Sequence, residues 1–115
     1  MKDFKWKIKI KAEHEDVWMA LTNPASMELW TGYSAVFKPI AGEEFSLWEG
    51  DITGKVLKVE EGKEIVEQWY FEGEDVESIV KLKVHNQKND VLVEVFHENI
   101  PNEAYDNIIE GWKHY

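Results

Sequence analysis

Apolar and polar residues alternate at the start of the chain, which is the pattern of a strand with one buried face. From Phe4 to Ile10, apolar side chains fall on one face and lysines on the other. Over residues 15–21 the period becomes that of a helix, and Asn23-Pro24 ends it. A second short helix is predicted over residues 25–30, with Thr31-Gly32 at its end.

Six further strand-like runs follow, separated by turn signals such as Glu61-Gly62-Lys63. They cover residues 35–38, 43–48, 52–60, 64–71, 77–85 and 91–97. Pro101 opens a final helix with one apolar stripe, formed by Ala104, Tyr105, Ile108, Ile109 and Trp112. The order predicts an α+β fold, in which an antiparallel sheet of seven strands carries its helices on one face.

Length and composition indicate one folded domain over residues 1–115, since 43% of the 115 residues are apolar. Thirteen basic residues against 23 acidic ones leave a net charge of −10, which disfavours nucleic acid and anionic membranes as partners. The absence of cysteine excludes disulfides and cysteine zinc sites. Because neither a secretory segment nor a membrane span is present, we expect a cytoplasmic protein.

Several short strings resemble one known family, and together they cover nearly the whole chain. They are Ala20-Leu21-Thr22-Asn23-Pro24, Leu29-Trp30-Thr31-Gly32, Phe37-Lys38-Pro39 with Gly42, Phe45-Ser46-Leu47-Trp48, Gly50-Asp51-Ile52-Thr53-Gly54, Ile65-Val66-Glu67-Gln68-Trp69, Ile100-Pro101 and Gly111-Trp112. The chain is similar to the domain named for activators of the heat-shock protein 90 ATPase. That family belongs to the START-like or SRPBCC superfamily, which includes the major birch pollen allergen.

The resemblance implies a helix-grip fold, in which a curved seven-stranded antiparallel sheet wraps around a C-terminal helix and two short helices follow the first strand. Eukaryotic relatives stimulate the chaperone's ATPase, and the chain resembles stand-alone bacterial members. Three features depart from the family pattern. Tyr70 replaces a frequent arginine, and residues 72–77 replace a tryptophan-proline loop. The sequence reaches Tyr115 at a point where the last helix of relatives usually continues, so this helix is expected to be either shortened or incomplete in the sequence.

Strand alternation and the stripe of the last helix place a mostly apolar set of side chains on the inner face of the sheet. We expect these side chains to line a cavity for a small apolar or aromatic molecule. The alternative is that they fill one another's space and leave no cavity. The candidate ligand-binding residues are Trp30, Phe45, Leu47, Glu67, Trp69, Phe71, Ser78, Val80, Val93, Val95, His97, Tyr105, Ile108 and Trp112.

Glu67 and His97 are the polar members of this set with acid–base chemistry. Single polar groups inside a sheet are more often hydrogen-bonded structural groups than catalysts. The four histidines lack metal-ligand spacing, and neither a nucleophile elbow nor a phosphate loop occurs. No catalytic residue, metal or cofactor is therefore predicted. The lysines at positions 5, 7, 9 and 11 are interpreted as a solvated strand face, with a docking site as the alternative.

The sequence leaves three hypotheses of function open. The first is a non-catalytic, monomeric domain that binds a small hydrophobic or aromatic molecule, with the link to chaperone or stress function that the resemblance implies. The second is a protein-interaction module that stimulates a heat-shock protein 90 type ATPase. The third is a small cyclase, dehydratase or hydrolase that uses Glu67 and His97.

Overall fold

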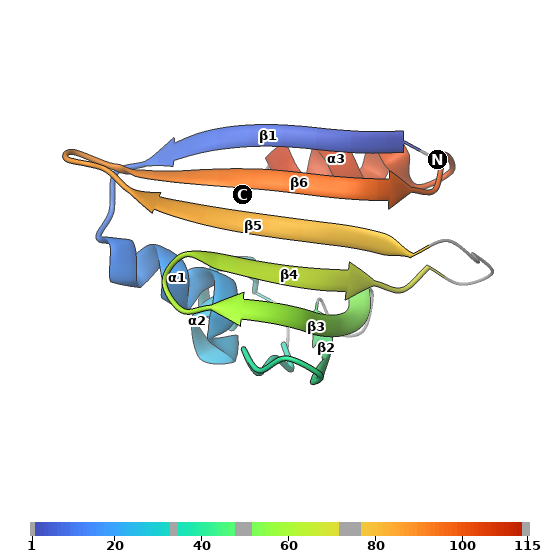
Figure 1. Ribbon diagram of the computed structural model, residues 1–115, viewed down its shortest axis with the longest axis horizontal. Coiled ribbons are helices and arrows are strands. Elements are labelled where there is room, and N and C mark those ends of the chain that lie inside the picture. Colours follow the sequence, from blue (N-terminus) through green and yellow to red (C-terminus); the bar gives the residue numbers. More distant parts are fainter. Residues whose placement is uncertain (1, 33–34, 48–51, 72–76, 114–115) are drawn as a thin grey trace.

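The fold is an antiparallel sheet with all of its helices on one face, as the computed structural model shows (Figure 1). The structure describes residues 2–32, 35–47, 52–71 and 77–113, with the side chains of 30–31 and 111–113 outside that description. The strands are β1 (Lys2–Ile10), β2 (Glu44–Leu47), β3 (Ile52–Glu60), β4 (Glu64–Trp69), β5 (Ser78–Asn86) and β6 (Val91–Ile100). Their spatial order is β1-β6-β5-β4-β3-β2, so the first strand of the chain lies at one edge, next to the last.

Three helices cover the inner face of this sheet: α1 (His14–Thr22), α2 (Pro24–Thr31) and α3 (Tyr105–Lys113). Asn23 separates the first two, since its backbone ends α1 and its side chain accepts a hydrogen bond from the backbone N–H of Ser26 at 3.1 Å. Gly32 then ends α2 in the left-handed conformation, at φ 79°. None of the helices in the described ranges is long and apolar enough to cross a membrane.

His14 fastens the start of α1 to the sheet. Its Nε2 lies 2.6 Å from the carbonyl oxygen of Gly62, in the turn between β3 and β4. At the third position of β3, only glycine fits beside β4, because a Cβ on Gly54 would collide with the carbonyl oxygen of Gln68. Phe45 on β2 also packs over this glycine, so that the short edge strand contributes a buried ring to the core.

The helix-grip fold is confirmed, and the described residues form six strands where seven were expected. The run 35–38 makes only an isolated bridge between Val36 and Ser46, and Val36 is exposed. Pro39 follows this run directly and has no N–H to donate, so a longer ladder is not favoured there. The last helix also starts later than expected, because residues 102–104 form a turn after Pro101. Other boundaries differ from the predicted ones by at most three residues, and those of β3 agree.

The hydrophobic core fills the space between the inner face of the sheet and the helices. Ile65, Val56 and Val80 are completely buried in the centre of the sheet. Val17 on α1 and Met27 on α2 close the core from the helical side. The side chains of β1 that face the core are only half-buried, which leaves room beside this edge strand.

Candidate functional site

A buried polar cluster occupies one end of the inner face, where β4, β5 and β6 meet. The Nε1–H of Trp69 donates a hydrogen bond of 3.0 Å to Oε1 of Glu67, two residues earlier on β4. The Trp69 ring also meets the His97 ring edge-on, with centroids 4.9 Å apart. All three side chains are buried, so the tryptophan lies between the carboxyl group and the imidazole.

Ser78 completes this cluster and sets the hydrogen-bonding role of His97. Its Oγ lies 2.8 Å from Nε2 of His97 and 3.1 Å from the carbonyl oxygen of Glu98. A carbonyl oxygen can only accept, so the single hydroxyl hydrogen points to Glu98 and Nε2 of His97 donates to Ser78. Both hydrogen bonds are satisfied when His97 is neutral and carries its hydrogen on Nε2.

Burial shifts the two titratable groups of the cluster in opposite directions. Loss of solvation raises the pKa of Glu67 to about 7, although the hydrogen bond from Trp69 opposes this shift. Loss of solvation lowers the pKa of His97 to about 4, against the attraction of Asp3. The cluster is therefore close to electrically neutral between about pH 4 and pH 7, which a buried position favours.

Glu67 and His97 do not share a hydrogen bond in the described structure. Glu67 pairs with Val80 on β5, and Val80 pairs with His97 on β6. Two strand spacings, about 10 Å, therefore separate the backbones of the two residues. The acid–base pair of the third hypothesis is thus two separate groups, each bonded to its own partner.

A pocket of about 250 Å³ lies next to the cluster, between the β1 edge of the sheet and α1. Its walls are apolar except for Asp16, at the rim formed by α1. Val95 lines the pocket and precedes His97 by two residues on the same face of β6, so the pocket and the cluster are neighbours. The lining residues are Trp6, Ile8, Ile10, Ala12, Asp16, Val17, Ala20, Leu21, Leu82, Val93 and Val95.

The residues predicted to bind a ligand are divided between three places. Val93 and Val95 line the pocket, while Glu67, Trp69, Ser78 and His97 form the cluster beyond its end. Val80 and Phe45 are buried in the core, and Leu47, Phe71 and Ile108 are half-buried against it. Tyr105 is half-buried with the Nζ of Lys2 at 4.6 Å from its ring centroid. The side chains of Trp30 and Trp112 lie outside the described residues.

Sequence reasoning left out most of the pocket wall. Trp6, Ile8 and Ile10 come from the alternating face of β1, and Ala20 and Leu21 come from the inner side of α1. The signals were present, because the alternation and the helical period identify all of these apolar faces except the small Ala20. Ordinary packing surfaces give the same signals, so the pattern by itself does not identify a pocket.

The described residues include no group of three His, Asp or Glu side chains that could hold a metal ion. His14, His85 and His97 each bond to a different partner in a different part of the fold. What the inner face does combine is a small apolar pocket with a buried carboxyl group whose pKa lies near neutrality.

Comparison with known proteins agrees with this architecture. Residues 11–115 match the family model described as Activator of Hsp90 ATPase homolog 1-like protein. Among curated proteins, none matches the chain at a significant level.

Solved structures provide the second comparison. An HSP90 activator from Plasmodium falciparum is 25% identical, with a TM-score of 0.87 over 97% of this chain and 88% of that one. The Aha1 dimer from Colwellia psychrerythraea is 18% identical, with a TM-score of 0.85 over 98% and 89%. A protein from Mesorhizobium loti is 24% identical, with a TM-score of 0.83 over 97% and 89%. The last two likenesses concern the fold alone. Because the family model matches residues 11–115 of its 115 residues, this chain belongs to the Activator of Hsp90 ATPase homolog 1-like family.

Proposed function

We propose that this domain binds a small apolar or aromatic molecule in the pocket between β1 and α1, without transforming it. The observation that carries the proposal is an apolar pocket of about 250 Å³ next to half-buried Trp6, Ile8 and Ile10. A ligand that covers these half-buried side chains removes apolar surface from water. This lowers the free energy by about 25 cal/mol for each Å² of apolar surface buried.

The size of the pocket restricts the ligand. Pockets for drug-sized ligands measure about 300–1,000 Å³, whereas a cavity of roughly 150 Å³ holds benzene. A pocket of about 250 Å³ therefore suits a molecule with one or two fused rings, or a short branched chain. Asp16 at the rim would favour a ligand whose polar or cationic end points toward solvent.

The polar cluster supports binding rather than catalysis in this proposal. Trp69 and Ser78 already occupy hydrogen-bonding positions on Glu67 and His97. Such a network keeps the end of the pocket rigid, because each buried polar group has a partner. The carboxyl group of Glu67, with its pKa of about 7, is the group that an enzymatic role would use.

Filling the pocket should abolish binding without harming the fold. In Ala20→Phe, the added ring would occupy the space between α1 and β1, so the affinity for one- and two-ring aromatics should fall at least about tenfold, and stability should stay level or rise by about 0.5–2 kcal/mol. Calorimetric titration with indole and naphthalene measures the affinity.

The matched control for this variant is Met19→Phe. Met19 precedes Ala20 on α1 but is 40% exposed, so the same added ring should leave the affinity within about twofold. Native mass spectrometry of the protein purified from its own cells would then give the mass of the natural ligand. Equal binding by the wild type and Ala20→Phe would refute the pocket as the binding site.

The second candidate function is stimulation of a heat-shock protein 90 type ATPase. It is supported by the matched family model and by the similarity to the Plasmodium falciparum HSP90 activator. The test is the ATPase rate of the cognate chaperone with and without this protein, in which an increase supports the function and an unchanged rate at saturating protein rejects it. Ala20→Phe in the same assay would show whether the pocket takes part.

A further inference from the structure

The outer face of the sheet carries a basic surface on an otherwise acidic protein. No described helix covers this face, since α1, α2 and α3 all lie behind the sheet (Figure 1). Lysines 5, 7 and 9 of β1 and lysines 81 and 83 of β5 flank the outward residues of β6 from both sides. We name this set, with Phe96 at its centre, the lysine–Phe96 surface.

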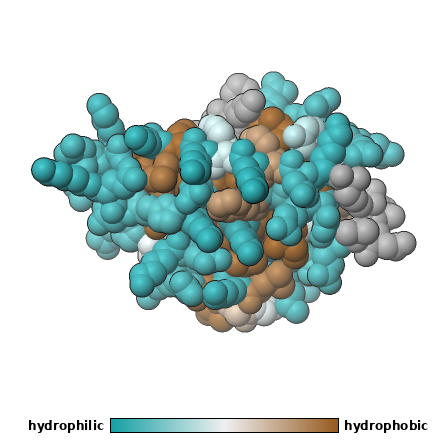
Figure 2. Space-filling view, turned by 45° about the horizontal axis from the view of Figure 1, so that its top comes forward, coloured by the Kyte–Doolittle hydropathy of each residue, from teal (hydrophilic) through white to brown (hydrophobic). Residues whose placement is uncertain are grey.

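The strand register aligns the residues of this surface across β1, β6 and β5. Phe96 is paired with Lys5 on one side and Lys81 on the other. The Nζ atoms of Lys5 and Lys83 lie 6.0 and 5.7 Å from the centre of the Phe96 ring. Figure 2 shows the molecule with the β1 edge turned toward the viewer. Hydrophilic side chains project from this side, and hydrophobic surface is visible between them.

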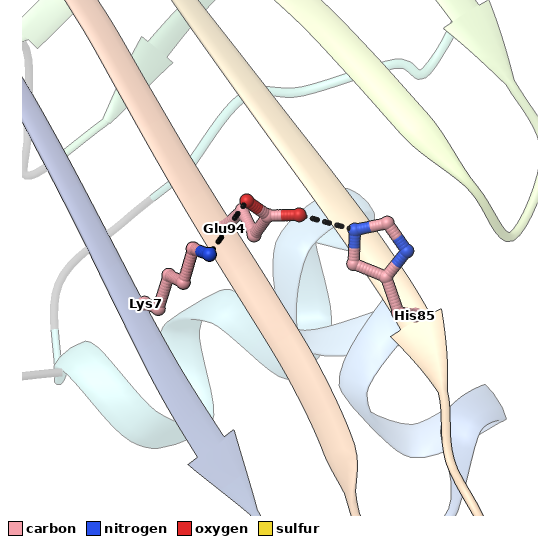
Figure 3. A network of polar contacts seen from close by, with 3 residues as sticks. All are labelled: Lys7, His85 and Glu94. Carbon is pink, nitrogen blue, oxygen red and sulfur yellow. Dashed lines mark hydrogen bonds and ion pairs between the residues drawn. The ribbon is translucent and has the colours of Figure 1, made fainter.

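Glu94 is the acid at the middle of this surface, and its carboxylate is already occupied. Its Oε2 lies 3.8 Å from Nζ of Lys7 on β1, and its Oε1 lies 2.6 Å from Nε2 of His85 on β5 (Figure 3). Within the described residues, Lys7 is the one lysine of the five with an ion pair. The other four ammonium groups are therefore available to the carboxylates of a partner.

Protection of the sheet edge accounts for only part of this charge. Lysines on the edge strand β1 discourage pairing with other chains. Lys81 and Lys83, however, lie on β5, which has strands on both sides and needs no such protection. Counted with Glu94 and Glu98 of β6 and with Glu64 of β4, which is paired with Lys83, the five lysines leave an excess of two positive charges here, on a chain of net charge −10.

We propose that the lysine–Phe96 surface docks a short acidic protein segment that carries an aromatic or large apolar residue among its carboxylates. Three strands span about 10 Å, and the five residues from Lys5 to Lys9 span about 13 Å, so the surface matches an extended segment of about five residues. Phe96 contacts the apolar residue, and the four lysines without an ion pair in the described structure receive the carboxylates. A long polyanion fits less well, because its further charges meet the acidic remainder of the protein.

The probe for this surface is a fluorescein-labelled octapeptide in which a tryptophan is flanked by aspartates and glutamates. Fluorescence anisotropy measures its affinity, and amide shifts in NMR spectra should locate it on β1, β5 and β6. The double variant Lys81→Glu with Lys83→Glu should weaken binding about tenfold or more.

The matched control is Lys55→Glu with Lys58→Glu on β3, which changes the net charge equally at a distance from Phe96. This control should change the affinity less than about twofold. Equal weakening by the two double variants would show an effect of net charge and overturn the proposal. So would equal binding of the same peptide with glutamine and asparagine in place of its acids.

Competing occupants supply further outcomes of the same experiment. Single-stranded DNA or phosphatidylserine vesicles that bind more tightly than the peptide would assign the surface to a different partner class and overturn the proposal. Sedimentation that shows self-association lost in Lys81→Glu with Lys83→Glu would assign it instead to a second copy of this chain. Because Ala20→Phe alters the pocket and leaves the outer face intact, peptide binding should be the same in that variant.

Discussion

Replacing Glu67 with glutamine should stabilise the protein at neutral and alkaline pH. Since burial raises the pKa of Glu67 from 4.5 to about 7, folding favours the protonated form. Its stabilising contribution is full below pH 4.5 and is lost as the pH rises to about 7. The loss amounts to about 3 kcal/mol at 1.36 kcal/mol per pKa unit, so Glu67→Gln should gain up to that amount at pH 8 and little at pH 4.5. Urea denaturation across this range measures the gain.

The contribution of His97 to stability depends on pH in the opposite direction to that of Glu67. Because its pKa is lowered from 6.5 to about 4, its contribution is full above pH 6.5 and is lost as the pH falls toward 4. Between pH 4.5 and 6.5 the two groups therefore offset each other in the wild type. In Glu67→Gln the contribution of His97 alone should remain, so stability should rise with pH. Glu64→Gln, which removes a carboxylate from the outer face of β4, is the control, and an identical pH profile for both variants would contradict the burial argument.

Replacing Trp69 with alanine should cost about 3–5 kcal/mol of unfolding free energy. The ring is 6% exposed and contacts His97, and its loss leaves a large cavity in the core. The change also removes the hydrogen-bond donor of the buried Glu67 carboxyl group. A loss of this size is a large share of the roughly 5–15 kcal/mol that stabilises a typical domain. Urea unfolding at pH 6 measures it.

Tyr70→Ala is the matched control for this variant. Tyr70 is the next residue and is 43% exposed, so its truncation should cost less than about 1 kcal/mol. Trp69→Phe separates the two effects of the indole, because it keeps a ring and loses the N–H group. In that variant the pKa of Glu67 should rise further, since the hydrogen bond from Trp69 lowers it. Trp69→Ala would contradict the described packing if it cost no more than Tyr70→Ala.

Most of the fold could be predicted from local pattern. Alternation in β1 and the Asn23-Pro24 boundary between α1 and α2 reflect backbone geometry, which neighbouring residues determine. The run 35–38 shows the limit of prediction from local pattern. Its composition suits a strand, but a strand also needs a partner along its length, and only Val36 finds one in Ser46.

The site was less predictable than the fold, because it depends on space and register rather than on period. Alternation places Trp6 on the inner face but does not show that the layer above it is incomplete. The pairing of Ser78 with His97 needs the register of β5 against β6. Glu67 and Trp69, two residues apart on one strand, were within reach of the sequence, since such residues point the same way.

The most direct measurement of the proposed function is an NMR experiment on methyl-labelled protein with bound indole or naphthalene. If the ligand lies between β1 and α1, intermolecular NOEs should connect its ring protons to the methyl groups of Ile8, Leu21 and Val93. Spectra of the ligand-free wild type supply the reference shifts, and those of Ala20→Phe with ligand should show no such NOEs. NOEs confined to methyl groups elsewhere, or a complete lack of binding at millimolar ligand, would contradict binding in this pocket.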